Sequence, residues 1–362
     1  MKSRFLLILT LLVAWSAALG DETALRRFEY SAEKMGVPVR LTFYADSDEL
    51  ASAAAEAVWK RFDELNDALS DWDPESELIR ACRAAEETRE PVAPSDDLRR
   101  ALEESRKFCI LTDGAFDPTV GPIVKLWRRS RYFHERPPRA LLEQAKGRVG
   151  LDVWTIDERG FSIERGARLD FGGIAKGMAL DDALETLERL GIKSALVNAS
   201  GDLRIGDPPP GKTGWRVGAA SLNDEPAFYC ELSNVGVASS GDANRYVEID
   251  GVRYSHIVDP RSREPLTRRC VSVVLAPTAT TADALASALC VLGVEESQPT
   301  FERLRREGAN GAPLEPLEYA LIVVKDAASD PPYEDSELEI VASPGFQALL
   351  EASRRAAAAN KK

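Results

Sequence analysis

Residues 151–206 read LDVWTIDERGFSIERGARLDFGGIAKGMALDDALETLERLGIKSALVNASGDLRIG and contain both kinds of regular element that the chain offers. At the start, apolar and polar residues alternate, which predicts two short strands over 150–156 and 160–164. Gly172-Gly173 then open a helix that continues to about Leu190. From Ala195 to Glu248 the alternation returns, and clusters of turn residues divide it into further short strands.

Similar patterns extend from this stretch toward both ends of the chain. On the N-terminal side they predict a strand over Met35–Tyr44, a helix from about Asp48 with Ser47 as its cap, a helix over 97–111, a charged surface connection over Arg128–Arg139 and a short helix near 140–147. On the C-terminal side they predict strands at Val271–Leu275 and Tyr319–Val324 and helices at about 281–292, 294–306 and 345–358. Strands and helices come in runs instead of alternating strictly. This favours an α+β fold with mixed or antiparallel sheets and packed helices.

Composition excludes several classes of protein. The chain has 362 residues, of which 44% are hydrophobic, and its formal charge is −13 from 46 Lys and Arg against 59 Asp and Glu. A protein that binds nucleic acid through its phosphates is expected to show the opposite balance, so nucleic acid is not an expected partner. The chain has two His and five Cys without a Cys-x-x-Cys pair, which excludes zinc fingers and redox motifs of that kind.

The first 20 residues are expected to be a signal peptide. Lys2 and Arg4 precede an apolar run from Phe5 to Ala18, and Ala18-Leu19-Gly20 has the small residues that a signal peptidase requires. An uncleaved N-terminal anchor is the alternative. We therefore expect an exported, periplasmic protein, soluble or peripheral to the membrane, with a single domain over residues 21–362. Two intertwined α/β subdomains within this range are the alternative. The five cysteines are an odd number, so at least one should remain a free thiol.

Five short segments contain more Gly, Asp and small polar residues than packing requires. They are Gly114–Gly121, Leu169–Gly177, Val197–Asp202, Tyr254–Pro260 and Thr280–Leu289. In the second, two glycines before a helix allow a phosphate to approach backbone N–H groups, and Lys176 adds a positive charge. The glycines could equally serve only close helix–strand packing. The fourth holds His256, although a single histidine is more often structural than catalytic.

The last of these segments has a spacing that suits a cation. On a helix, Asp283 and Ser287 are four residues apart and share a face. One carboxylate and one hydroxyl are ligands that suit Mg²⁺, which completes its shell with water and substrate phosphate. The alternative is that Asp283 only stabilises the helix N-terminus.

Taken together, these segments resemble one family. GAFDPTVGPIVKLW (114–127), LDFGGIAKGMALDDAL (169–184), LVNASGDLRIGD (196–207), SSGDANRY (239–246) with YSHIVDP (254–260), and SVVLAPTATTADALASAL (272–289) occur in the order seen in ApbE-type FAD:protein FMN transferases. The resemblance covers residues from roughly 30 to 350. It implies an ApbE-like fold and a Mg²⁺-dependent enzyme that cleaves FAD, releases AMP and joins FMN through a phosphoester to a Thr or Ser hydroxyl of an exported or membrane flavoprotein.

The resemblance also assigns roles to individual residues. His256 would be the general base, and Gly173, through its carbonyl, would bind the metal together with the side chains of Asp283 and Ser287. The residues expected to contact FAD are Met35, Trp72, Ala115, Phe116, Asp117, Asp170, Lys176 and Val258. The chain departs from the family pattern in having Ser287 for the usual Thr, Ser200-Gly201 for Gly-Gly and Ser262-Arg263 for Thr-Gly.

Two other functions are compatible with parts of this pattern. A Mg²⁺-dependent FAD pyrophosphatase would use the same residues with water in place of the acceptor hydroxyl. A non-catalytic periplasmic flavin-binding protein would not need a base and a metal site together, so the presence of His256, Asp283 and Ser287 argues against it. The sequence leaves the oligomeric state open between monomer and homodimer.

Overall fold

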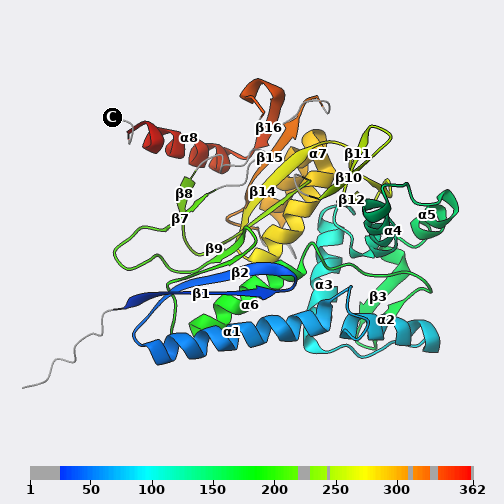
Figure 1. Ribbon diagram of the computed structural model, residues 1–362, viewed down its shortest axis with the longest axis horizontal. Coiled ribbons are helices and arrows are strands. Elements are labelled where there is room, and N and C mark those ends of the chain that lie inside the picture. The colour runs from blue at the N-terminus through cyan, green and yellow to red at the C-terminus, as the bar shows by residue number, and fades with distance from the viewer. Residues whose placement is uncertain (1–24, 219–228, 243–244, 309–312, 327–332, 360–362) are drawn as a thin grey trace, which may run out of the picture.

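An antiparallel sheet of eight strands forms the centre of the computed structural model, which describes residues 25–218, 229–242, 245–308, 313–326 and 333–359. Figure 1 shows helices grouped around this sheet and, at one end, a smaller helical lobe. Strand order is β1-β2-β5-β6-β9-β14-β15-β16. The bounds are β1 Arg26–Lys34, β2 Val37–Ala45, β5 Ala195–Ala199, β6 Asp202–Ile205, β9 Val235–Gly241, β14 Cys270–Ala276, β15 Glu318–Val324 and β16 Leu338–Ala342.

Four two-stranded hairpins lie outside this sheet, and the helices complete the fold. The hairpin strands are β3 Trp154–Asp157 with β4 Gly160–Ile163, β7 Trp215–Gly218 with β8 Tyr229–Leu232, β10 Tyr246–Ile249 with β11 Val252–Ser255, and β12 Val258–Asp259 with β13 Glu264–Pro265. The helices are α1 Asp48–Leu69, α2 Glu77–Thr88, α3 Asp96–Leu111, α4 Gly121–Phe133, α5 Arg139–Lys146, α6 Ala175–Arg189, α7 Ala279–Glu307 and α8 Pro344–Ala359. The α+β prediction is confirmed.

Strand β14 shows how the sheet is covered on both faces. All seven of its residues are buried, and successive side chains point to opposite sides. Val274 and Ala276 belong to the main core with α6 and α7, whereas Val273 and Leu275 belong to a second cluster that includes Phe346 of α8. A strand buried on both faces reads as a continuous apolar run, which explains why Val271–Leu275 was recognisable in the sequence.

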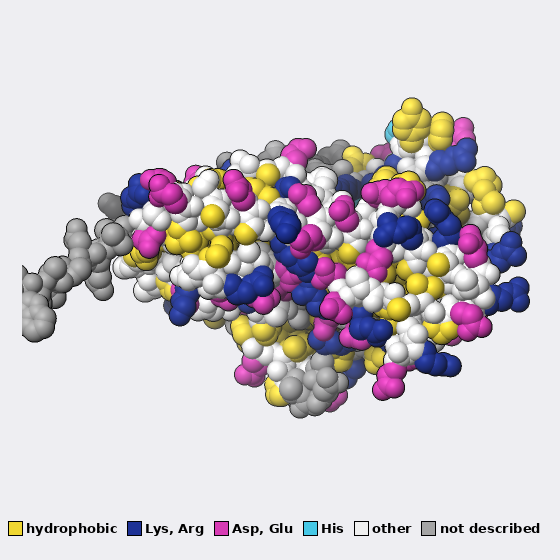
Figure 2. All heavy atoms as spheres, turned by 90° about the horizontal axis from the view of Figure 1, so that it is seen from below, with side chains coloured by type: hydrophobic (Ala, Val, Ile, Leu, Met, Phe, Trp, Pro, Cys, Tyr) yellow, Lys and Arg dark blue, Asp and Glu magenta, His cyan; other side chains and the backbone are white. Residues whose placement is uncertain are grey.

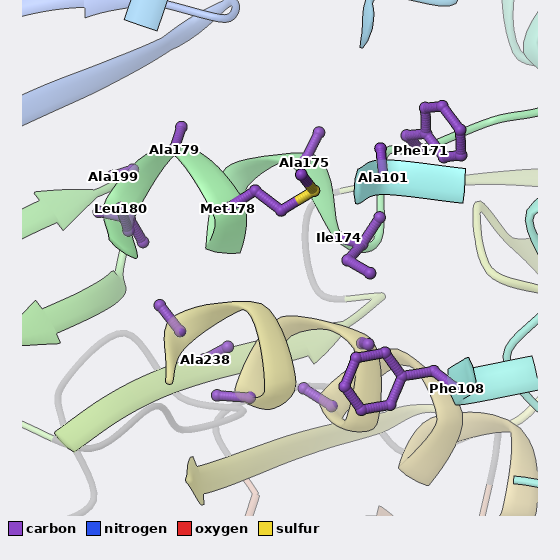
Figure 3. Packing of buried hydrophobic residues seen from close by; sticks show 14 of the residues in the cluster. Ala101, Phe108, Phe171, Ile174, Ala175, Met178, Ala179, Leu180, Ala199 and Ala238 are labelled. Carbon is purple, nitrogen blue, oxygen red and sulfur yellow. The ribbon is translucent and has the colours of Figure 1, made fainter. Parts of the chain in front are cut away.

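Helices α6 and α7 cross the sheet in close contact with each other. Figure 3 shows Ile174 pointing from α6 toward α7, whereas Ala175 and Ala179 point to the opposite side of α6. Inside α7, Gly293 has the non-helical angles φ 69° and ψ −165°, so the helix is broken there. The prediction of two helices that meet between residues 292 and 294 is therefore confirmed.

Two features near the N-terminal half also agree with the sequence. Ser47 caps α1, since its Oγ accepts a hydrogen bond from the backbone N of Leu50 at 3.4 Å. Helix α3 occupies the predicted range to within one residue. The proposed signal peptide lies outside the described residues. Among those that are described, no helix has the length and apolar character needed to cross a membrane.

Other expectations are wrong in detail. The first half of the expected surface connection over Arg128–Arg139 is helical, because α4 extends to Phe133. Its apolar residues Ile123 and Trp127 lie one turn apart and pack into a third core cluster with Tyr254, which outweighs the charged composition. The strand expected from residue 150 begins only at Trp154, after a 3-10 turn over Leu151–Val153. The sequence did not predict α2, β1, β16 or the short strands β11, β12 and β13.

Candidate active site

The close contact between α6 and α7 creates a buried polar site. Gly177 lies so near to α7 that a Cβ there would be 2.4 Å from the carbonyl oxygen of Ala279. At this distance the backbone N of Gly177 donates a hydrogen bond to Oδ2 of Asp283 at 3.0 Å. Lys176, next to Gly177, places its Nζ 3.1 Å from Oδ1 of Asp283. The two segments with LDFGGIAKG and TTADALAS are thus joined directly.

A second carboxylate completes this site. Asp202, the first residue of β6, has Oδ2 2.9 Å from Nζ of Lys176, and its Oδ1 accepts a hydrogen bond from the backbone N of Ser239 at 2.9 Å. Asp202 and Asp283 are both buried, so two carboxylates face one ammonium group. Burial and the charge of Asp202 raise the pKa of Asp283 to about 6, although Lys176 opposes the shift. The site therefore carries excess negative charge.

The remaining predicted metal ligands lie at the same place. A Cβ at Gly173 would be 3.0 Å from Oγ of Ser287 and 3.3 Å from the ring of Phe116, so the bare backbone packs against that hydroxyl. Oγ of Ser287 is also 3.2 Å from Oγ of Ser240. In the described part of the chain, no cluster of three or more His, Cys, Asp or Glu side chains is suited to a metal. A cation here would bind carboxylate, hydroxyl and carbonyl oxygens, and such a set of hard ligands with excess negative charge fits Mg²⁺.

The expected flavin-binding segments are tied to the same region. The backbone N of Asp170 donates to the carbonyl of Pro118 at 2.7 Å, which links the segments at 114–121 and 169–177. Asp117 is buried and accepts hydrogen bonds from the N and Oγ1 of Thr119 at 2.8 and 2.7 Å. Ala115 and Phe116 are buried beside it. These residues therefore form one hydrogen-bonded wall next to Gly173.

Arg128 connects two other expected FAD contacts, and sequence reasoning gave it no role. Its guanidinium donates to Oδ2 of Asp170 at 2.8 Å and to Oδ2 of Asp71 at 2.5 Å. The same group lies over the ring of Trp72, with Cζ 4.1 Å from the ring centroid. Trp72 is 71% exposed, so the other face of its indole is free to stack on a planar ligand. Burial and the charge of Asp71 raise the pKa of Asp170, and Arg128 opposes the shift.

His256 lies at the end of the β10–β11 hairpin. Its backbone N donates to the carbonyl of Arg245 at 2.9 Å, and its Nδ1 is 3.1 Å from the same oxygen, so Nδ1 is the protonated nitrogen when it donates there. This arrangement leaves Nε2 as the free base. Burial, followed by the charges of Arg245 and Arg131, lowers the pKa of His256 to about 4. The ring is therefore neutral at pH 7.

The structure gives positions for the last two predicted residues. Val258 is buried in β12, two residues beyond His256. Met35 lies in the tight turn between β1 and β2 with φ 51° and packs against the main core. The backbone N of Ser200 donates to the carbonyl of Pro38 at 3.0 Å, so this turn is close to the loop that leads to Asp202. A contact of Met35 with FAD stays a prediction.

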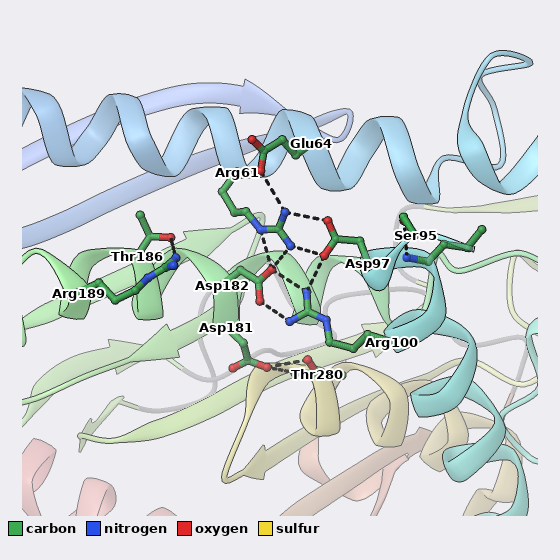
Figure 4. Close-up of polar contacts among 11 residues, drawn as sticks. Arg61, Glu64, Ser95, Asp97, Arg100, Asp181, Asp182, Thr186, Arg189 and Thr280 are labelled. Carbon is green, nitrogen blue, oxygen red and sulfur yellow. Dashed lines mark hydrogen bonds and ion pairs between the residues drawn. The ribbon is translucent and has the colours of Figure 1, made fainter. Parts of the chain in front are cut away.

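The start of α7 is held by residues that the sequence did not single out. Asp181 of α6 accepts hydrogen bonds from the backbone N of Ala279 at 2.9 Å and of Thr280 at 2.8 Å, as Figure 4 shows in part. The neighbouring Asp182 is buried and binds Arg61 of α1 and Arg100 of α3. These contacts fix α6 between its neighbours and fix α7 on α6, and so determine where Asp283 lies. Sequence spacing gives no sign of ion pairs between such distant segments.

Comparison with known proteins supports the same grouping of segments. Residues 35–309 match the model of the ApbE family. The chain belongs to the ApbE family. It is 30% identical to the FAD:protein FMN transferase of Haemophilus influenzae over 291 residues, which are 75% of this chain and 83% of that protein. It is also 30% identical to the enzyme of the same name from Vibrio cholerae over 298 residues, covering 78% and 86%.

Solved structures of ApbE proteins have the same fold. The flavin transferase ApbE from Vibrio cholerae superposes with a TM-score of 0.73 at 26% identity, and the ApbE protein from Thermotoga maritima with a TM-score of 0.74 at 28% identity. Each comparison covers 90% of this chain and 99% of the other. The chain is therefore a transferase of the ApbE family with the fold of that family, as the resemblance implied.

Proposed function

We propose that this ApbE-family transferase cleaves FAD in the presence of Mg²⁺ and transfers FMN to a Thr or Ser hydroxyl of an exported or membrane flavoprotein, releasing AMP. The observation that carries the proposal is the buried group of Lys176, Asp202 and Asp283 beside Gly173 and Ser287. The names of the relatives support the identity of the donor and of the transferred group. Their similarity extends over most of both chains.

The proposed reaction exchanges one phosphoester partner for another. The acceptor oxygen forms a bond to the phosphorus of the FMN half, the bond between this phosphorus and the bridging oxygen of the diphosphate breaks, and AMP departs with the electron pair of that bond. The proton of the acceptor hydroxyl passes to Nε2 of His256. A Mg²⁺ ion held by Asp283, Ser287 and the Gly173 carbonyl would supply positive charge to the phosphate oxygens.

The protein's own groups then position the donor. Lys176 and the backbone around Gly172-Gly173, at the start of α6, are suited to hold a phosphate, since a helix N-terminus favours an anion. Trp72, backed by Arg128, offers one open aromatic face for a planar ring. Asp117, Asp170 and the buried Phe116 form the adjoining wall. Transfer of a phosphoryl-type group depends mainly on such positioning and on charge stabilisation.

Hydrolysis of FAD to FMN and AMP is the second candidate. The same residues would serve, and neutral His256 would take a proton from water in place of the hydroxyl. The two functions differ in product and not in site, so the distribution of the flavin between protein and solution decides between them.

Export of the enzyme is part of the proposal. Residues 1–20 have the basic and apolar regions of a signal peptide, and an acceptor in the same compartment would meet the enzyme after translocation. Comparison of the N-terminus of the purified protein with Asp21 tests this directly. A protein that still begins at Met1 would contradict cleavage.

Transfer is tested with a co-expressed candidate acceptor. The purified enzyme, FAD and Mg²⁺ are incubated with and without the acceptor, and both covalent flavin on the protein and free FMN are measured. We expect the acceptor to gain the mass of FMN on a hydroxyl residue, with equal amounts of AMP. Free FMN as the sole flavin product, at a rate that the acceptor does not change, would contradict transfer and favour hydrolysis.

A further inference from the structure

A basic and aromatic surface lies beside His256 and is not used in the chemistry described above. Residues 121–139 contain six Lys or Arg and a single acidic residue, Glu135, although the whole chain carries −13. Most of this stretch is α4. Figure 2 shows hydrophobic and basic side chains projecting together at the end of the molecule where Figure 1 places α4 and α5.

The aromatic part of this surface is exposed to solvent. Tyr132 is 81% exposed and Phe133 54% exposed, and their rings contact edge to face with centroids 4.9 Å apart. Arg129 lies over the ring of Phe133 at 5.4 Å. Isolated exposed aromatic residues are ordinary, but a pair of them among arginines is typical of a surface that binds a protein.

The basic part of the surface reaches His256. Arg131 is one turn beyond Trp127, whose ring stacks on Tyr254 of β11 at 4.7 Å, so this face of α4 packs on the hairpin that carries His256. Burial and the charges of Arg128 and Arg245 lower the pKa of Arg131, which shows that like charges surround it. Among the described residues, neither Arg131 nor Arg245 forms an ion pair with a carboxylate. Half-buried Arg131 therefore has unused capacity for an anion.

We propose that this α4 patch, formed by Arg129, Arg131, Tyr132, Phe133 and Arg245, is the docking surface for the acceptor protein and selects an acidic segment next to the modified Thr or Ser. The proposal rests on the function proposed above. Charge complementarity identifies the partner: guanidinium groups without carboxylates fit an acidic segment, and their place beside His256 fits a segment that must present its hydroxyl there. Bound carboxylates would also offset the two arginine charges that lower the pKa of His256.

A displayed library of 12-residue peptides with one central Thr and otherwise random positions tests the selection. The purified enzyme with FAD and Mg²⁺ modifies the library, and the peptides that carry covalent FMN are isolated by flavin fluorescence and sequenced. We expect enrichment of Asp and Glu within a few residues of the Thr. We expect Arg131→Glu and Arg245→Glu to abolish or reverse this enrichment and to raise the KM for a selected acidic peptide about five- to tenfold.

Matched controls separate docking from damage to the site. Arg216→Glu makes the same change of charge on β7, at the other end of the molecule, and should leave the peptide selection as it is in the parent. Tyr132→Ser with Phe133→Ser should also raise the KM for the peptide. For each variant, transfer is divided by acceptor-free FAD cleavage, so that a general loss of activity does not count as a loss of docking.

Several results of the peptide-library experiment would overturn the docking proposal. Modified peptides without acidic enrichment, or enrichment that Arg131→Glu leaves intact, would overturn the docking proposal. So would a library in which no peptide is modified while the co-expressed acceptor gains FMN, whereas an acceptor that gains no FMN contradicts the proposed function itself. Arginine-dependent flotation of the protein with anionic phospholipid vesicles, without peptide selection, would assign the patch to a membrane instead.

Discussion

Replacing Gly177 by Ala is expected to separate the two helices that hold the active site. The added Cβ would meet only backbone atoms: the carbonyl oxygen of Ala279 at 2.4 Å, its carbon at 2.7 Å and Cα of Thr280 at 2.7 Å. Real Cβ atoms hardly ever approach closer than 3.0 Å, so α6 and α7 must move apart by at least 0.6 Å. The hydrogen bond of 3.0 Å from Gly177 to Asp283 would lengthen by a similar amount.

Both stability and activity should change by measurable amounts. Overpacking of this kind costs about 1–3 kcal/mol of the free energy of unfolding. Misplacement of a reacting group by about 1 Å can slow a reaction about 10²-fold, so we expect a loss of Mg²⁺-dependent FAD cleavage of ten- to a hundredfold. Thermal unfolding followed by circular dichroism measures the first effect, and AMP release as a function of Mg²⁺ concentration measures the second.

Gly147→Ala is the matched control for this experiment. Gly147 has φ −68°, and the atom nearest to an added Cβ is the carbonyl oxygen of Gln144 at 3.7 Å, so the methyl group has room. Its stability and activity should equal those of the parent. A Gly177→Ala protein that is folded and has the parent's activity and Mg²⁺ requirement would refute the link between this helix contact and the site.

Three further substitutions test the roles of individual side chains. Asp283→Ala should abolish Mg²⁺-dependent release of AMP, because it removes the one carboxylate among the proposed metal ligands. His256→Ala should slow FMN transfer about 10²–10⁴-fold while the affinity for FAD, measured by flavin fluorescence, changes little. Because the pKa of His256 is lowered to about 4, the ring is neutral above that pH, so the ratio of parent to variant rates should stay constant from pH 5.5 to 8 and fall as the pH approaches 4. Arg128→Lys should raise the KM for FAD about tenfold with a smaller effect on kcat, because Lys cannot bind Asp71 and Asp170 and stack on Trp72 at once.

For each of these substitutions, one result would reject the role assigned to the side chain. Turnover by Asp283→Ala at low Mg²⁺ would reject the metal assignment. A His256→Ala enzyme that transfers FMN at the parent rate, or a rate ratio that changes near pH 6.5, would reject His256 as a base with a lowered pKa. An unchanged KM for FAD in Arg128→Lys would mean that Trp72 and Asp170 bind FAD without help from Arg128, or do not bind it.

The sequence predicts well the parts of the site that are formed by residues close together in the chain. The helical spacing of Asp283 and Ser287 puts both on one face, and the Gly172-Gly173 pair marks the start of α6, so these parts of the site were visible without a structure. The two segments were paired through family resemblance and not through spacing. Their contact depends on Gly177 fitting against Ala279, about a hundred residues away.

What the sequence did not predict depends on packing between distant segments. Asp202 reaches Lys176 because α6 packs against β6, and no local pattern encodes that neighbour. The sequence analysis placed Arg128 in a charged surface connection, because only a few residues form the apolar side of α4. This side packs on the β10–β11 hairpin, which follows in the chain over a hundred residues later. The lowered pKa of His256 has the same origin, because Arg131 and Arg245 come from different elements.

The bridge that Lys176 makes between Asp202 and Asp283 has a consequence for how the protein matures. Two buried acids so close together would repel each other strongly, and in small zinc domains the ligands do not assemble until the ion arrives. Here a covalently attached ammonium acts as a built-in counterion for both acids. The polypeptide can therefore reach its final shape before the proposed Mg²⁺ binds, and we expect its folding not to depend on how much magnesium surrounds the newly made chain.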